Sequence, residues 1–81
     1  MKKNALIIGL GYVGLNLARK FSSLGWKIAG TSRNSEKLKG LNGLISIPLL
    51  WNENFLESFK KLNWKPDIII ITVGPSSKNI D

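Results

Sequence analysis

Three glycines lie close together near the start of the chain, in the stretch ALIIGLGYVGLNLARKF. Gly9, Gly11 and Gly14 have the spacing G-x-G-x-x-G, between an apolar run and a stretch of helical periodicity. In such a pattern the first glycine permits a tight turn, the second leaves room for a pyrophosphate against the backbone, and the third allows close helix packing. The first N–H groups of the helix and its dipole then face the anion. This context predicts a phosphate-binding loop rather than a glycine-rich turn that binds nothing.

A second candidate site follows the expected second strand, where the sequence reads GTSRN. NAD-binding domains carry an Asp or Glu about 20 residues after the glycines, and it accepts hydrogen bonds from the ribose. Here no acidic residue occurs before Arg33, and Ser32 takes the position of the acid. A hydroxyl and a guanidinium suit a 2′-phosphate, to which Lys37 can add weaker attraction. The sequence therefore predicts NADP(H) in preference to NAD(H); the alternative is that Arg33 is only a solvated loop residue.

A third candidate site is TVGPSS, at the end of the last apolar run. Ligands of open α/β sheets lie beyond the carboxyl ends of the strands, at the switch in strand order. We expect Val73, Gly74 and Pro75 to line the cofactor there. An ordinary exit from a strand into a loop is the equally weighted alternative.

Short apolar runs alternate with helical stretches, which predicts an α/β fold with a parallel sheet. We expect strands at Ala5–Ile8, Lys27–Thr31, Leu44–Leu49 and Ile68–Val73, and helices at Val13–Leu24, Ser35–Lys39 and Glu53–Leu62. Pro48 favours an edge position for the third strand, in agreement with the Rossmann-like order 3-2-1-4. Residues 1–81 then form one dinucleotide-binding unit, the first half of an incomplete doubly wound domain. Its fourth strand is left with an uncovered apolar face and a bare edge.

Local signals give more detail about the helices. Gly25 ends the first helix, and Ser35 is expected to cap the second. Apolar stripes at helical spacing are expected to face the sheet. The first stripe comprises Val13, Leu17, Phe21 and Leu24, and the second Phe55, Leu56, Phe59 and Leu62.

Composition excludes several classes of function. The chain has neither cysteine nor histidine, which removes disulfides, thiolate or imidazole metal sites and a His-based triad. The formal net charge of +7 comes from scattered side chains without interleaved aromatics, so we expect no nucleic-acid partner. No apolar run approaches the roughly 18–20 residues that cross a bilayer, and the glycine-broken N-terminus is unlike a signal peptide. We therefore expect a cytoplasmic protein.

The segments LIIGLGYVGLNLARKF, GWKIAGTSRNSEKL and PDIIIITVGPS together resemble the N-terminal part of extended or atypical short-chain dehydrogenase/reductases, the NAD-dependent epimerase/dehydratase group. The resemblance spans nearly the whole chain. It implies cofactor contacts from Gly9, Gly11, Tyr12, Val13, Gly14, Ser32, Arg33, Val73 and Gly74. Many members carry an Asp after the third strand that contacts adenine, where this chain has Leu49 and Leu50.

That group also carries a catalytic Tyr-x-x-x-Lys pair. The single tyrosine, Tyr12, is followed by Asn16 instead of lysine, so we expect no catalytic residue in this chain. IGLGYVGL also resembles the opening of NAD-using nucleotide-sugar 6-dehydrogenases, which usually read Gly-Val-Asp where this chain has Gly30-Thr31-Ser32. A stand-alone module that binds nucleotides or self-associates is the non-enzymatic alternative. In either case, we expect a second copy or the remainder of a longer chain to cover the fourth strand.

Overall fold

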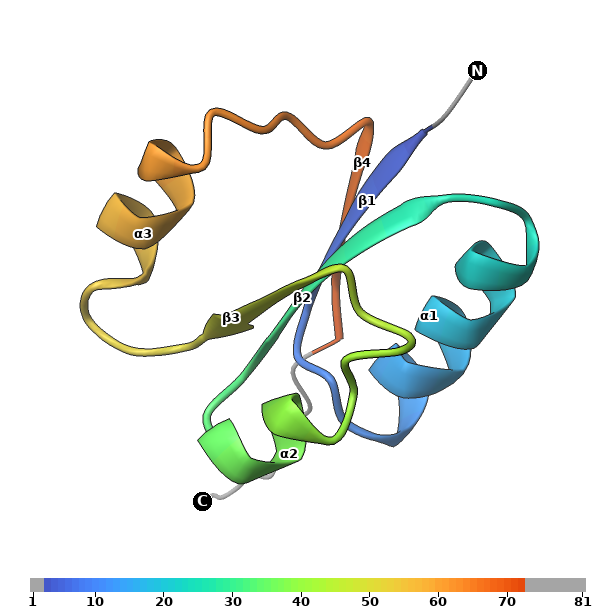
Figure 1. Ribbon diagram of the computed structural model, residues 1–81, viewed down its shortest axis with the longest axis horizontal. Helices are drawn as coiled ribbons and strands as arrows, with labels where there is room; N and C mark the ends of the chain where they lie inside the picture. Colours follow the sequence, from blue (N-terminus) through green and yellow to red (C-terminus); the bar gives the residue numbers. More distant parts are fainter. Residues whose placement is uncertain (1–2, 73–81) are drawn as a thin grey trace.

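Strand and helix alternate along residues 3–72, the part of the chain that the computed structural model describes (Figure 1). The elements are β1 (Asn4–Ile8), α1 (Tyr12–Ser23), β2 (Lys27–Ser32), α2 (Ser35–Lys39), β3 (Ile47–Leu50), α3 (Phe55–Lys61) and β4 (Ile68–Ile71). All pairs of neighbouring strands are parallel, in the order β3-β2-β1-β4. The predicted fold class and strand order are confirmed, including the edge position of the proline-containing strand.

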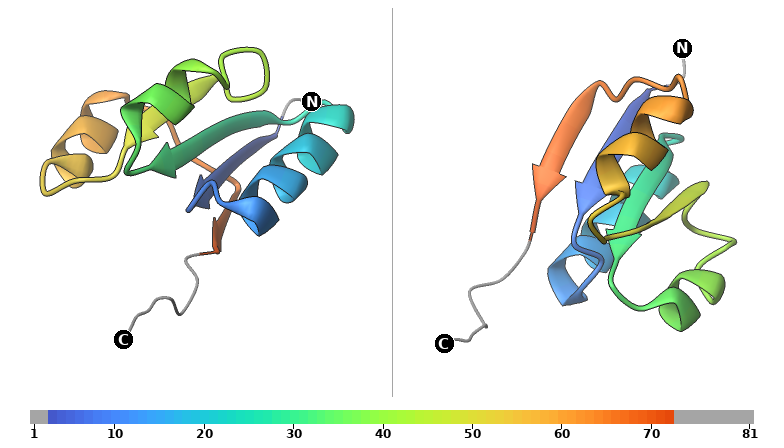
Figure 2. Two further views of the ribbon diagram at one scale, coloured as in Figure 1. Left: turned by 90° about the horizontal axis from the view of Figure 1, so that it is seen from below. Right: turned by 90° about the vertical axis from the view of Figure 1, so that its left-hand side faces the viewer.

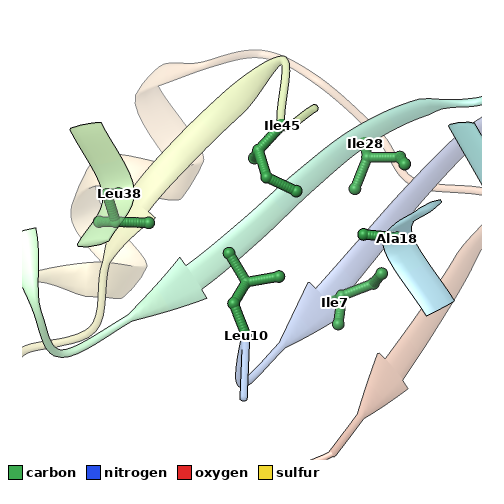
Figure 3. Close-up of a cluster of buried hydrophobic side chains, with 6 residues drawn as sticks. All are labelled: Ile7, Leu10, Ala18, Ile28, Leu38 and Ile45. Carbon is green, nitrogen blue, oxygen red and sulfur yellow. The ribbon is translucent and has the colours of Figure 1, made fainter. Parts of the chain in front are cut away.

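The helices divide between the two faces of the sheet, with α1 and α2 on one side and α3 on the other (Figure 2). Because side chains alternate along a strand, β1 supplies both faces. Ile7 packs in the cluster that α1 and α2 cover, whereas Leu6 packs under Phe55 of α3. Figure 3 shows the first cluster, with Ala18 of α1 and Leu38 of α2 facing the sheet.

The third strand is shorter than predicted, since β3 begins at Ile47 and not at Leu44. Leu44 and Ile45 instead end a turn, in which both N–H groups donate to the carbonyl of Leu41. The apolar residues of this stretch still contribute to the core, because the side chain of Ile45, at the end of the turn, is buried there. A largely apolar run, interrupted by Ser46, thus concealed a change from turn to strand.

The stripe predicted for the first helix is only half correct. Leu17 and Phe21 pack against the core, but Val13 and Leu24 are exposed, and the buried residues of α1 are Gly14 and Ala18. Small residues face the sheet because the helix lies close to it. The predicted stop is confirmed: Leu24 is the C-cap, and Gly25 follows with a φ of 88°.

The cap of α2 and part of the stripe of α3 also differ from expectation. Asn34 caps α2 in place of Ser35, since its Oδ1 accepts the N–H groups of Glu36 and Lys37 at 3.0 and 3.2 Å. In α3 the aromatic members of the predicted stripe, Phe55 and Phe59, pack on the sheet.

Leu56 and Leu62, the aliphatic members of the same stripe, are exposed. The short helix presents only its aromatic side to the sheet. Leucines at nearly the right spacing therefore remain in solvent.

The fourth strand is an apolar edge within the described part of the chain. Its register with β1 places Ile69 and Ile71 on the same face as Leu6 and Ile8. That face is covered by α3 near β3, and the side chains of Ile69 and Ile71 remain 55% and 66% exposed. The expected uncovered strand is confirmed.

Candidate functional site

The loop that joins β1 to α1 has a different requirement at each glycine. Gly9 has a φ of 104°, a conformation that side-chain-bearing residues rarely adopt. Gly11 is the N-cap of α1, and a Cβ atom placed there would meet nothing within 4 Å. The first glycine therefore turns the chain, and the second leaves an open surface at the start of the helix.

Gly14 is buried for a different reason. A Cβ at this position would lie 2.0 Å from the carbonyl oxygen of Gly9 and 2.9 Å from Oγ1 of Thr72. The third glycine was expected to let the helix pack against the sheet. Its close neighbours are the loop carbonyl and the residue that follows β4, so it brings the helix onto the end of the sheet.

The N-terminus of α1 presents backbone donors. The first intrahelical bond runs from the N–H of Leu15 to the carbonyl of Gly11 at 2.9 Å. The amides of Tyr12, Val13 and Gly14 precede it and have no carbonyl one turn back to bond. No side chain caps this end, and the first turn holds no acidic residue. An anion would find donors and the positive end of the helix dipole here.

Leu10, between the first two glycines, anchors the loop in the core. Its side chain is 2% exposed and points into the cluster of Figure 3. A Cβ at Gly30 would lie 2.7 and 2.8 Å from the two Cδ atoms of Leu10. Gly30 on β2 therefore makes the space that Leu10 occupies. Sequence reasoning overlooked this pair because Leu10 is an unspecified position of the glycine motif and Gly30 fits an apolar strand.

The two threonines of the chain hold the same loop. Both lie in stretches named as candidate sites, GTSRN and TVGPSS, but neither was among the residues expected to contact the cofactor. Oγ1 of Thr31 accepts the N–H of Gly9 at 2.9 Å, and its carbonyl accepts the N–H of Leu10 at 2.8 Å. On the other side, the hydroxyl of Thr72 donates to the carbonyl of Gly9. Their positions directly after apolar strand runs were the available signal.

The tip of β2 lies beside the loop, because Ile7 of β1 pairs with Gly30 of β2 in a parallel ladder. Ser32 Oγ accepts the N–H of Asn34 at 3.1 Å, and Arg33 is exposed to solvent. Tyr12 and Val13 are also exposed, at the start of α1.

Seven of the nine predicted site residues thus lie at the carboxyl edge of the sheet, in two groups: Gly9, Gly11, Tyr12, Val13 and Gly14 in the loop and first turn, and Ser32 and Arg33 after β2. Val73 and Gly74 lie outside the described residues, so their expected contacts stay predictions.

Neither a metal-binding cluster nor a membrane-spanning helix is found in residues 3–72. No group of three or more His, Cys, Asp or Glu side chains there could hold a metal ion. Within the same range, no helix has the length and apolar character needed to span a bilayer.

The fold and the loop define a Rossmann-like α/β unit, with a glycine-rich turn between its first strand and first helix. A solved chain described as "SsCR_L211H", a carbonyl reductase of the short-chain dehydrogenase/reductase type, has the same fold, with a TM-score of 0.73 and 17% sequence identity. The match covers 100% of this chain and 27% of the carbonyl reductase. No protein-family model and no curated protein matches the sequence.

Proposed function

We propose that this chain is the cytoplasmic cofactor-binding part of a nicotinamide-dependent oxidoreductase, and that it binds NADP(H) in preference to NAD(H). The observation that carries the proposal is the open surface at Gly11, at the start of an uncapped helix. The likeness to a short-chain carbonyl reductase supports the oxidoreductase class. Membership of the epimerase/dehydratase group is a further part of the proposal, supported by the sequence resemblance.

The pyrophosphate would lie against Gly11, where a side chain would exclude it. Backbone amides of the first turn of α1 would donate to its oxygens, and the helix dipole would add favourable potential. The absence of an acidic side chain in this turn removes a source of repulsion. Tyr12 and Val13, both exposed at this end of the helix, would contact the dinucleotide through their side chains.

The adenosine end would lie at the tip of β2. Arg33 is exposed there, and its planar guanidinium can form two parallel hydrogen bonds to a phosphate. Ser32 accepts one bond from the backbone and keeps its hydroxyl hydrogen for a ligand oxygen. The position where NAD-binding domains hold a carboxylate thus carries a neutral donor followed by a cation, which favours a 2′-phosphate.

A bound nicotinamide cofactor would supply hydride transfer. The residues of this chain would hold and orient it, because Tyr12, the chain's one tyrosine, is followed by Asn16 where the short-chain pair has lysine. The proton-transfer groups and the substrate pocket would come from other segments of a longer protein. Consistent with that, this chain spans 27% of the carbonyl reductase it matches.

Calorimetric titration with NADPH and NADH tests the proposal. We expect both dinucleotides to bind, with NADPH the tighter ligand. Absence of any binding would refute dinucleotide recognition, whereas equal affinities would refute only the 2′-phosphate preference. Tighter NADH binding would favour the nucleotide-sugar dehydrogenase alternative, whose family uses NAD.

A stand-alone module that associates through β4 is the second candidate. The exposure of Ile69 and Ile71 favours it, because apolar strand edges promote pairing with another chain. The downstream reading frame distinguishes the two candidates. A Tyr-x-x-x-Lys beyond Asp81 supports the enzyme, and a stop codon there supports the module.

A further inference from the structure

Gly9 is held from both sides of β1 by threonines. Its N–H donates to Oγ1 of Thr31 on β2 at 2.9 Å, and its carbonyl accepts the hydroxyl of Thr72 after β4. The same Thr72 hydroxyl lies 3.3 Å from the carbonyl oxygen of Ile8. These threonines are the chain's two, and they lie at the ends of β2 and β4, the strands on either side of β1.

We propose that Thr31 and Thr72 are positioning residues, which fix the glycine loop in its phosphate-binding shape before a ligand arrives. This inference rests on the proposed function and adds to it two residues that need not touch the dinucleotide. Their effect is on preorganisation, because a loop already in its bound shape loses less entropy on binding.

The need for such positioning follows from the glycines themselves. A glycine populates both positive and negative φ readily, so a loop with two of them in three positions has many conformations. Gly9 is nevertheless set at 104°. With the N–H and the carbonyl of Gly9 both bonded to side chains, its peptide planes can rotate only if a hydrogen bond breaks.

The two threonine hydroxyls have opposite hydrogen-bonding roles toward Gly9, and each can be tested by its own substitution. Thr31, 1% exposed, acts as an acceptor for Gly9, whereas Thr72 acts as a donor. Valine has the shape of threonine without the hydroxyl, and serine keeps the hydroxyl without the methyl group. Valine at either position should therefore remove one hydrogen bond to Gly9 and loosen the loop, whereas serine should keep the hydrogen bond.

The experiment compares two probes, ADP and 2′-AMP, on the wild-type chain and on Thr31→Val, Thr72→Val and the corresponding serine variants. ADP needs the loop, whereas 2′-AMP engages the tip of β2. We expect each valine variant to bind ADP about three- to tenfold more weakly, as loss of one net hydrogen bond predicts. Binding of 2′-AMP should be unchanged, serine should recover most of the loss, and Ile71→Val on the exposed face of β4 should behave as wild type.

Folding is checked by circular dichroism, and ligand-free hydrogen exchange of the Gly9 amide gives a second measurement. Exchange that accelerates in both valine variants supports the inference, even if the wild type binds no dinucleotide and the proposed function fails. Folded valine variants with unchanged exchange and unchanged ADP affinity would overturn it. Equal weakening of ADP and 2′-AMP would also overturn it, since a general loss of structure would then be the cause.

Discussion

A Cβ atom at position 14 would lie 2.0 Å from the carbonyl oxygen of Gly9, closer than any real contact of this kind. The obstacle is backbone, and that backbone is itself bonded to Thr72. It cannot move aside as a flexible side chain can. The third glycine of the motif is therefore a packing requirement of the fold, whereas Gly11, with open space around it, is free for a ligand.

Gly14→Ala should therefore destabilise the chain. Overpacking typically costs about 1–3 kcal/mol, and a clash this close with backbone belongs in the upper part of that range. The cost therefore exceeds the gain of roughly 1 kcal/mol when Ala replaces Gly within a helix. Urea denaturation measures the change. Gly11→Ala is the matched control and should lose less stability, because its Cβ meets no obstacle and only the N-cap preference for glycine over alanine is given up. A Gly14→Ala variant as stable as that control would contradict the packing role.

Gly11→Val should give the opposite combination of results. Stability should fall less than in Gly14→Ala, because a Cβ at this position meets nothing within 4 Å apart from its chain neighbours. Binding of NADPH and NADH should both be abolished, since the new side chain would occupy the space of the pyrophosphate. Fluorescence or calorimetric titration measures the binding. A variant that still binds either dinucleotide would show that the phosphate site lies elsewhere.

Arg33→Ala should change the preference between cofactors and leave the loop intact. Loss of a charge-assisted hydrogen bond weakens NADPH binding by roughly 1–3 kcal/mol, while NADH, which lacks the 2′-phosphate, should be nearly unaffected. Lys39→Ala, on the exposed end of α2, is a control for the general loss of positive charge. Equal weakening by the two variants would reduce Arg33 to a solvated loop residue.

The order of the elements could be predicted from the sequence because apolar runs and glycine stops are local signals. The glycine spacing likewise placed the loop correctly between β1 and α1. Contacts between distant segments could not be predicted in this way. The bonds from Thr31 and Thr72 to Gly9 join residues 22 and 63 positions apart, and no short pattern encodes them.

Helix faces were harder to predict than helix bounds, because periodicity records spacing and not distance to the sheet. Val13 fits the apolar stripe of α1, yet the residue that faces inward is its neighbour Gly14. Close approach to the loop selects the smallest side chain, so the bulkier residue is left in solvent. A prediction that weights hydrophobicity alone will miss such positions.

Gly30→Ala tests a packing contact of another kind. Here the added Cβ would meet the flexible end of Leu10, so the cost should be smaller than at Gly14, about 1 kcal/mol or more. Shortening the neighbour in the double variant Leu10→Val with Gly30→Ala should recover part of the loss. Additive effects in a double-mutant cycle, measured by chemical denaturation, would show that the two residues are not coupled.

The exposed face of β4 leads to a prediction about association. Ile71, 66% exposed, lies at the open edge of the four-stranded sheet next to Ile69. Burial of such side chains against another chain contributes a favourable free energy of roughly 25 cal/mol per Å² of apolar area, which favours pairing at this edge.

Analytical ultracentrifugation of the 81-residue chain should show a sedimentation coefficient that rises with protein concentration. Ile71→Lys should remove this dependence, because a charge on the edge opposes strand pairing, whereas Leu56→Lys on the solvent side of α3 should not. A wild-type chain that sediments as a monomer at all concentrations would contradict association through β4.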